Sequence, residues 1–132
     1  MGNVSSIQKI NFENMQTAIQ NNTCIINTLN LDEQTCLIKN TLSCYKEEEL
    51  INSLLKSSNK NYKIIIYGKN TNDPSILKKY DQLQKLGFKS IYIYLGGLFE
   101  WLCLQDIYGD ENFPTTSKEL DILKYKPSSC NI

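Results

Sequence analysis

The chain has 132 residues and a mass of 15.2 kDa, its basic residues are all Lys, and these 14 Lys balance 14 acidic residues. A chain of this length exposes roughly 22,000 Å² unfolded and about 7,000 Å² folded, which predicts one domain with a core that needs no disulfide or metal. Neutral charge argues against a nucleic-acid partner, because phosphate neutralisation needs clustered Lys and Arg. The absence of His excludes Ser–His and Cys–His pairs and His-ligated zinc. Cysteine, lysine or carboxylate chemistry remains, or no chemistry.

The five cysteines are odd in number and irregularly spaced, which is typical of a reducing compartment. They are Cys24, Cys36, Cys44, Cys103 and Cys130. Seven residues separate Cys36 from Cys44, which does not match zinc-site spacing, so we expect no metal and no cofactor. No apolar run is long enough to span a membrane, and no signal peptide is visible. The expected location is the cytoplasm or the cytosolic face of a membrane.

The first half of the chain alternates strand-length apolar runs with helical patterns. Asn11 is placed to cap a helix, because apolar residues over 12–19 recur at helical spacing. The further elements expected here are strands at 9–11, 24–28 and 36–38 and a helix at 47–56.

The middle of the chain contains a strand at 62–67 that is apolar on both faces, as in the centre of a parallel sheet. Asp73 stands directly before Pro74, which suits the first position of a helix, so Asp73 is predicted to cap it. Gly87 is placed to end this helix in the left-handed conformation.

The last third of the chain predicts a strand at 90–95, a turn at Gly96-Gly97 and a buried helix at 98–106. Residues 116–119 have capping-box spacing and predict a short helix before Pro127. This alternation predicts an α/β fold, a three-layer domain with a mostly parallel, about five-stranded sheet flanked by helices.

The loop from Gly68 to Asp73 follows the central strand at the sheet edge where parallel folds bind ligands. It comprises Gly68, Lys69, Asn70, Thr71, Asn72 and Asp73. Backbone N–H groups in such a turn form an anion-binding nest, and a thiolate there would be stabilised as a nucleophile. Position 68, however, is glycine. Lys69 is the cation of this loop and is either solvated or holds a weakly bound anion.

Residues 67–75, the strand 90–95, the Gly96-Gly97 turn and Trp101 together resemble a single rhodanese domain. That family has an apolar strand, Tyr-Cys, a short loop ending in Arg, a helix, a further strand, Gly-Gly and Trp. Upstream, residues 25–28 and 38–42 fall on two more family motifs, with Leu29 in place of its Arg and Leu37 in place of its His. The resemblance covers about residues 9–126 and implies a rhodanese-like fold.

The resemblance also implies what is missing. Active rhodaneses carry Cys at the position of Gly68 and commonly Arg near that of Asp73, so we interpret Gly68 as turn geometry and Asp73 as a helix cap. We therefore expect a catalytically inactive rhodanese-like module that acts through a protein partner. Two alternatives remain: a sulfurtransferase that uses an unconventional thiol, and a relative of the dual-specificity phosphatases, which share the fold. The candidate thiols for the first alternative are Cys36, Cys44 and Cys103.

The side chains of Trp101, Tyr92, Tyr94 and Cys103 are interpreted as core packing rather than as functional groups. The aromatic residues lack the basic groove that accompanies a base-stacking platform. Cys103 has apolar neighbours on its helix, whereas a nucleophilic thiol needs an electropositive, accessible site.

The first six residues, Met-Gly-Asn-Val-Ser-Ser, match the myristoylation pattern and make Gly2 a lipidation candidate. We divide the chain into an N-terminal arm at 1–8, the rhodanese-like domain at 9–126 and a tail at 127–132. One acyl chain gives marginal affinity, and Lys9 is the lone nearby cation, so membrane attachment through Gly2 is expected to be reversible.

Overall fold

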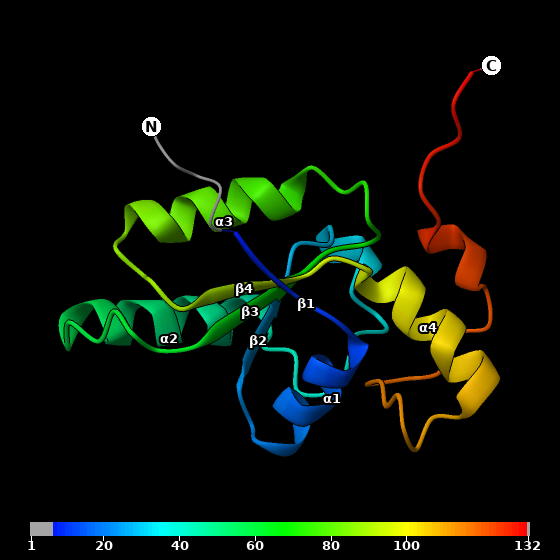
Figure 1. The fold of residues 1–132 in the computed structure, drawn as a ribbon, viewed down its shortest axis with the longest axis horizontal. Coiled ribbons are helices and arrows are strands. Elements are labelled where there is room, and N and C mark those ends of the chain that lie inside the picture. The colour runs from blue at the N-terminus through cyan, green and yellow to red at the C-terminus, as the bar shows by residue number, and fades with distance from the viewer. Residues whose placement is uncertain (1–6, 132) are drawn as a thin grey trace.

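Four strands form one parallel sheet in a computed structural model of the chain, which describes residues 7–131 (Figure 1). In chain order the elements are β1 (Gln8–Ile10), α1 (Phe12–Gln20), β2 (Cys24–Asn27), the 3-10 helix η2 (Leu31–Glu33), α2 (Cys44–Lys56), β3 (Ile64–Tyr67), α3 (Ser75–Lys85), β4 (Ile91–Tyr94), α4 (Gly97–Tyr108) and the 3-10 helix η3 (Ile122–Tyr125). The strand order is β1-β4-β3-β2, and every neighbouring pair is parallel. The three-layer α/β prediction is confirmed.

Each face of the sheet packs against two helices. On β3, Ile65 and Tyr67 point into one hydrophobic core, which also contains buried side chains of α1 and α4. Ile64 and Ile66 point into a second core, shared with buried side chains of α2 and α3. All four residues of β3 are buried, as expected of a central strand covered on both sides.

Local capping signals set several helix ends. Asn11 and Asn14 form a reciprocal capping box at the start of α1, with N–H to Oδ1 distances of 3.0 and 3.1 Å. Helix α2 begins three residues earlier than predicted because Ser43 caps it, its Oγ accepting the Lys46 N–H at 3.3 Å. Gly87, at φ +100°, follows α3 in the left-handed conformation predicted for it.

The predicted fifth strand at 36–38 is wrong, and the sheet has four strands. The segment is buried as its apolar character demands, but its backbone pairs outside the sheet. Ile38 forms an isolated antiparallel bridge with Thr115, and the Lys39 N–H donates to the Pro114 carbonyl at 3.1 Å. The segment thus forms hydrogen bonds with the loop at 114–117 and, through the Ile38 N–H, with the Tyr67 hydroxyl at 3.1 Å.

The capping box predicted at 116–119 does not form, for the same reason. The Thr116 hydroxyl accepts the Leu37 N–H at 3.0 Å, and the Thr116 N–H donates to the Leu37 carbonyl at 2.8 Å. Glu119 instead pairs with Lys124 at 2.5 Å. The helical turn comes later, as η3.

Within residues 7–131, no helix has both the length and the apolar character needed to cross a membrane. The same residues contain no group of three His, Cys, Asp or Glu side chains arranged to hold a metal ion. Gly2, the lipidation candidate, lies outside the described residues.

Candidate functional site

The loop 68–73 lies at the carboxyl end of β3, between the end of β2 and the start of α4. The Thr28 N–H donates to the Tyr67 carbonyl at 3.0 Å, which ties the end of β2 to the head of the loop. On the other side, the Leu98 N–H donates to the Gly68 carbonyl at 2.9 Å. Gly97 allows this approach: it has φ +71°, and a Cβ there would lie 2.7 Å from the Gly68 carbonyl oxygen. The Gly96-Gly97 turn of the sequence is thus part of the loop's support.

Asp73 folds back into the loop, where its carboxylate accepts three hydrogen bonds. Its Oδ2 accepts the Lys69 N–H at 3.0 Å and the Thr28 hydroxyl at 3.2 Å. Its Oδ1 accepts the Ser75 N–H at 2.9 Å, at the start of α3. The helix begins at Ser75 with Pro74 as its N-cap residue, so the predicted cap position of Asp73 is wrong by one residue, although its carboxylate still accepts an N–H at the start of the helix. The carboxylate thus accepts one of the backbone N–H groups that an external anion would use in this loop.

Gly68 has no room for a side chain while Asp73 holds this position. A Cβ on Gly68 would lie 2.6 Å from Asp73 Oδ2 and 2.7 Å from Ile76 Cγ1. Distances this short force a neighbour to move. Close packing therefore favours glycine at this position, whereas its φ lies outside the left-handed region, so the turn itself does not require glycine.

Lys69 forms an ion pair and is not simply solvated. Its Nζ lies 2.6 Å from Glu33 Oε2, and both side chains are about a quarter to a third exposed. Glu33 belongs to η2, after β2. The positive charge expected to attract an anion is balanced inside the protein.

Asn70, one of the six loop residues named from the sequence, has a structural role that the sequence did not assign to it. It is buried, its Oδ1 accepts the Asn72 N–H at 2.9 Å, and its Nδ2 donates to the Tyr125 carbonyl at 2.9 Å. The second bond attaches η3 to the loop. Above the loop a cavity of about 260 Å³ remains, lined also by Thr28 and Lys126.

None of the five thiols belongs to this loop. Cys24 and Cys36 are buried, and burial, followed by the charge of Glu47, raises the pKa of the Cys24 thiol to about 12. Cys103 is half-buried on α4, where burial and then the carboxylates of Asp106 and Glu100 raise its pKa. Cys44 and Cys130 are exposed.

The aromatic residues near the loop pack in the core, as interpreted from the sequence. Trp101 is fully buried, its Nε1 donates to the Pro114 carbonyl at 3.1 Å, and its ring meets that of Tyr94 edge-on with centroids 6.0 Å apart. The Tyr94 hydroxyl donates to Glu100, and burial followed by this bond raises the pKa of Tyr94.

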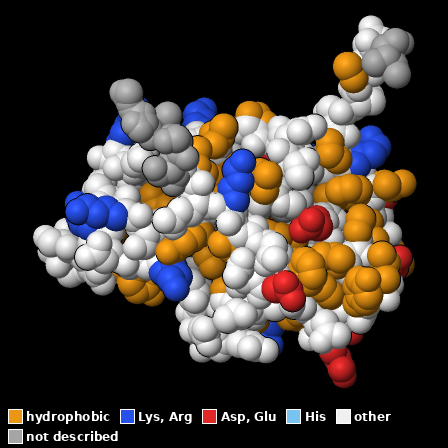
Figure 2. All heavy atoms as spheres, viewed as in Figure 1, with side chains coloured by type: hydrophobic (Ala, Val, Ile, Leu, Met, Phe, Trp, Pro, Cys, Tyr) orange, Lys and Arg blue, Asp and Glu red, His pale blue; other side chains and the backbone are white. Residues whose placement is uncertain are grey.

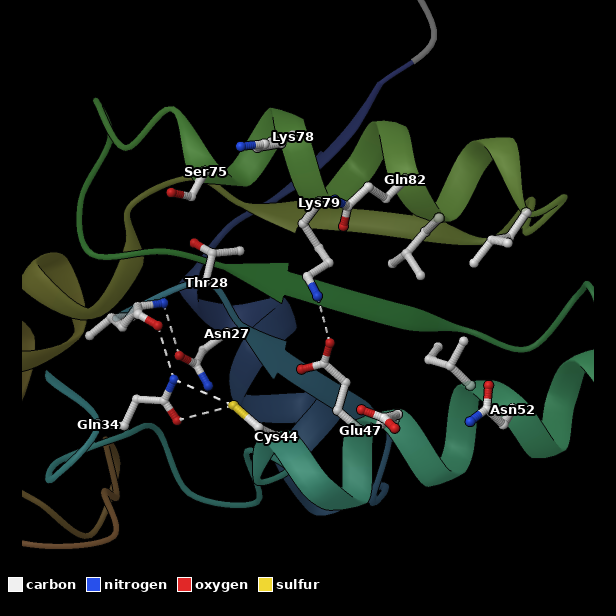
Figure 3. A pocket seen from close by; sticks show the side chains of 15 residues that line it. Asn27, Thr28, Gln34, Cys44, Glu47, Asn52, Ser75, Lys78, Lys79 and Gln82 are labelled. Atoms are coloured by element: carbon white, nitrogen blue, oxygen red, sulfur yellow. Dashed lines mark hydrogen bonds and ion pairs between the residues drawn. The ribbon is translucent and has the colours of Figure 1, made fainter. Parts of the chain in front are cut away.

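A second cavity, of about 590 Å³, lies between α2 and α3 and adjoins the loop (Figure 3). We call it the α2–α3 groove. Thr28, Leu29 and Ser75 line both cavities. A Lys79–Glu47 ion pair of 2.6 Å joins α3 to α2 within the groove, and Cys44 lines its wall. Sequence reasoning named Cys44 as a thiol but did not place it in a cavity, because the walls come from separate elements.

Comparison with known proteins agrees with this fold. The family model of the rhodanese-like domain matches residues 16–103, so the chain belongs to the rhodanese-like family. The solved structure of yeast Ygr203w, described as a protein tyrosine phosphatase of the rhodanese family, is 14% identical, with 91% of this chain and 99% of that chain covered and a TM-score of 0.64. The Alr3790 protein from Anabaena sp. is 16% identical over 87% of this chain and 97% of that chain, with a TM-score of 0.60. No curated protein matches the sequence.

Proposed function

We propose that this domain is a catalytically inactive rhodanese-like module that acts through protein contacts. The observation that carries the proposal is the Asp73 carboxylate, which accepts the Lys69 N–H and the Thr28 hydroxyl inside the β3–α3 loop. The loop's own side chain takes the place of a bound anion.

Catalysis at this loop would need a nucleophile and a free nest. Gly68 supplies no nucleophile, and the negative charge of Asp73 disfavours both a neighbouring thiolate and an anionic substrate. The yeast relative is described as a protein tyrosine phosphatase. A phosphoryl group entering this loop would meet a carboxylate where it needs hydrogen-bond donors, so we do not extend phosphatase activity to this chain.

Activity assays on three forms of the protein test the inactive loop. Wild type and Gly68→Cys should both show thiosulfate:cyanide sulfurtransferase and phosphatase rates equal to a blank, because a side chain at position 68 meets Asp73 and Ile76. Gly68→Cys/Asp73→Ala removes the repelling charge and is the form in which a thiolate should become detectable by alkylation.

Turnover by wild type would contradict the proposal. If that turnover disappeared in Cys44→Ser, Cys36→Ser or Cys103→Ser, the alternative of a sulfurtransferase with an unconventional thiol would replace it. Loss of turnover on changing Asp73 alone would instead identify the carboxylate as functional.

For the protein contact we propose the α4–η3 surface, defined by the exposed side chains of Ile107, Tyr108, Leu120 and Leu123. Figure 2 shows hydrophobic side chains gathered over this end of the molecule with acidic side chains beside them. Residues 97–125, from α4 to η3, contain six acidic residues and two Lys, and one of these, Lys124, pairs with Glu119. Charge complementarity thus favours a partner segment that has apolar side chains flanked by Lys or Arg, and it disfavours a second copy of this chain.

Site-specific crosslinking in cells tests this surface. A photoreactive amino acid at Ile107 should crosslink a protein through a segment rich in apolar and basic residues, and Asp106→Lys should reduce the yield. The same probe at Leu77, an exposed position on α3, is the matched control. Identical products from both positions, products unaffected by Asp106→Lys, or crosslinks to the chain itself would contradict the assignment.

We also propose that Gly2 is myristoylated and attaches the module reversibly to a membrane. Support comes from the Met-Gly-Asn-Val-Ser-Ser sequence alone. In cells with N-myristoyltransferase, part of the wild type should sediment with membranes while Gly2→Ala stays in the supernatant. Equal distributions and an unmodified N-terminal peptide would contradict this.

A further inference from the structure

Lysine side chains gather at one edge of the sheet, the edge at which its strands begin. Residues 50–64 and 82–93 contain five Lys and no acidic residue, although the whole chain is neutral. These segments lead into β3 and β4, and the edge strand β1 adds a sixth cation. Figure 2 shows Lys side chains around β1 and α3, whereas the acidic side chains of this face gather toward α4. We call this surface the basic edge, and it comprises Lys9, Lys56, Lys60, Lys63, Lys85 and Lys89.

The register of the sheet brings these lysines together from distant parts of the chain. Gln8 of β1 pairs with Tyr92 of β4, and Tyr92 pairs with Ile65 of β3, so the three strands begin side by side. Two strand spacings, about 10 Å, separate β1 from β3. The Lys89 N–H donates to the Lys60 carbonyl at 3.0 Å, which ties together the connections that precede β3 and β4. Six cations from five segments of the sequence thus form one surface.

Most of the charge of the basic edge is not balanced inside the protein. Lys85 pairs with Asp81 at 2.9 Å, and both side chains of this pair are exposed. The other exposed lysines of the surface form no ion pair within residues 7–131, and these are Lys9, Lys56, Lys63 and Lys89.

The ends of two helices explain a part of this pattern. Lys56 and Lys85 are the last residues of α2 and α3, where a cation stabilises the helix dipole. Lys63 and Lys89 lie in connections and have no such role, and Lys63 Nζ lies 5.9 Å from the centroid of the Tyr92 ring. Repulsion between neighbouring like charges destabilises a fold, and an anionic partner relieves it.

An exposed leucine lies among these lysines and indicates the kind of anion. The side chain of Leu86 is 42% exposed, and its carbonyl accepts the Lys60 ammonium at 2.8 Å. Leucine surrounded by Lys is typical of surfaces that lie in the headgroup region of a bilayer. A surface for single-stranded nucleic acid would instead offer aromatic rings for stacking, but Phe88 in this segment is buried.

The segment that carries Gly2 joins the domain at the basic edge. Ile7 directly precedes β1 and packs against the core shared with α2 and α3. It lies five positions after Gly2, which corresponds to about 18 Å of fully extended chain at most. An acyl chain on Gly2 would therefore enter a bilayer within reach of the basic edge. Lys9, the lone cation near Gly2 in the sequence, has further cations beside it in the fold.

We propose that the basic edge binds the surface of an anionic phospholipid bilayer and supplies the second of two signals for membrane attachment. The attachment as a whole rests on the acylation proposed for Gly2, whereas the attraction of the lysines to anionic lipid does not. One acyl chain gives only marginal binding, and each Lys near an anionic surface raises the affinity about fivefold. The basic edge thus converts marginal binding into attachment that depends on the lipid.

Vesicle sedimentation of the full chain without an acyl group tests the basic edge by itself. The protein is produced in a host without N-myristoyltransferase and mixed with vesicles of phosphatidylcholine, either alone or with about 30% phosphatidylserine. At about 20 mM salt it should sediment with the mixed vesicles and stay in the supernatant with phosphatidylcholine. At about 150 mM salt the affinity should fall at least about tenfold through screening, which is why Gly2→Ala is expected in the supernatant of cells.

Matched variants locate the binding on the surface of the protein. Lys63→Gln/Lys89→Gln removes two charges of the basic edge and should lower the affinity for mixed vesicles at least about tenfold. Lys118→Gln/Lys126→Gln removes two exposed charges near η3 and should change the affinity less than about twofold. Leu86→Gln should lower it about threefold, because an apolar contact with the bilayer is lost. Equal losses in the two Lys variants, or equal binding to both kinds of vesicle, would contradict the proposal.

Two further measurements separate a bilayer from other anionic partners. A short single-stranded oligonucleotide should bind more weakly than the mixed vesicles at the same salt, and tighter binding would overturn the proposal in favour of a nucleic acid. The protein should remain monomeric in sedimentation velocity, and self-association that Lys63→Gln/Lys89→Gln abolishes would assign the basic edge to another copy of this chain. An acylated N-terminal peptide from cells, together with no binding of the unacylated chain to mixed vesicles, would remove the basic edge from the account and leave the acylation of Gly2 in place.

Discussion

The cavity at the β3–α3 loop and the α2–α3 groove are adjacent and share Thr28 and Ser75, but they differ in how their polar groups are paired. In the loop, Asp73 accepts the Lys69 N–H, and the Lys69 ammonium pairs with Glu33. In the groove, the Lys79–Glu47 pair joins the two helices, and the side chains of Asn52, Lys78 and Gln82 are exposed. Polar groups of the first kind are paired within the protein, whereas those of the second kind are hydrated. The loop, where the family resemblance leads one to look for chemistry, is therefore the more internally paired of the two.

The largest expected effect is a difference in alkylation rate between two thiols. Cys24 lies in the core beneath α2 and α3, and Cys44 lies in the wall of the α2–α3 groove. Burial, with a smaller contribution from Glu47, raises the pKa of Cys24 from 9.0 to about 12, whereas Cys44 is exposed. A rise of this size lowers the thiolate fraction about a thousandfold. In the native protein at about pH 8, iodoacetamide should alkylate Cys24 more than about a hundredfold more slowly than Cys44.

Labelling of Cys24 should rise about tenfold per pH unit up to its pKa, because only the thiolate reacts. Peptide mass spectrometry at several pH values measures both rates. Comparable alkylation rates for the two thiols would show that the Cys24 thiol is not shielded from solvent.

On the loop side, the largest effect on stability is expected from Gly97→Ala. The new Cβ would lie 2.7 Å from the Gly68 carbonyl oxygen at φ +71°, so strain and overpacking together should cost about 3 kcal/mol of unfolding free energy. Gly109 is the matched control, with φ +98° and no heavy atom within 4 Å of a Cβ, and Gly109→Ala should cost about 1 kcal/mol. Urea denaturation measures both. Equal costs would mean that the loop does not depend on close contact with α4.

Smaller effects are expected at Asp73. Asp73→Ala removes the acceptor for the Ser75 and Lys69 N–H groups and should cost about 0.5–2 kcal/mol. Asp73→Asn keeps one oxygen and should cost less than about 1 kcal/mol. Denaturant midpoints measure both costs. An Asp73→Ala variant as stable as wild type would contradict a stabilising role for the Asp73 carboxylate at the start of α3 and would favour a ligand-binding role for the loop.

Signals that act between near neighbours in the chain predicted the fold well. The Asn11 cap, the glycine end at Gly87 and the contact of Asp73 with the start of α3 each involve residues within a few positions of one another, so local sequence predicts them, with the cap position at Asp73 wrong by one residue. The buried run at 64–66 identified the central strand in the same way.

The errors and omissions involve partners that are distant in the chain. Residues 36–38 and Thr116 satisfy each other's backbone, which removed both a predicted strand and a predicted helix start. In the site, Lys69 lies 36 positions after Glu33, and Asp73 lies 45 positions after Thr28. Periodicity and local caps carry no information on such pairs, so the second role of Asp73 could not be predicted.

Amide NMR during anion titration tests most directly whether the loop is filled by its own carboxylate. Thiosulfate and phosphate should leave the Lys69–Asp73 amide shifts of wild type unchanged, because Asp73 already accepts the Lys69 N–H. In Asp73→Ala the freed nest should bind both anions, and the Lys69 amide should shift in a saturable way. Saturable shifts of equal size and midpoint in wild type and Asp73→Ala would contradict the account.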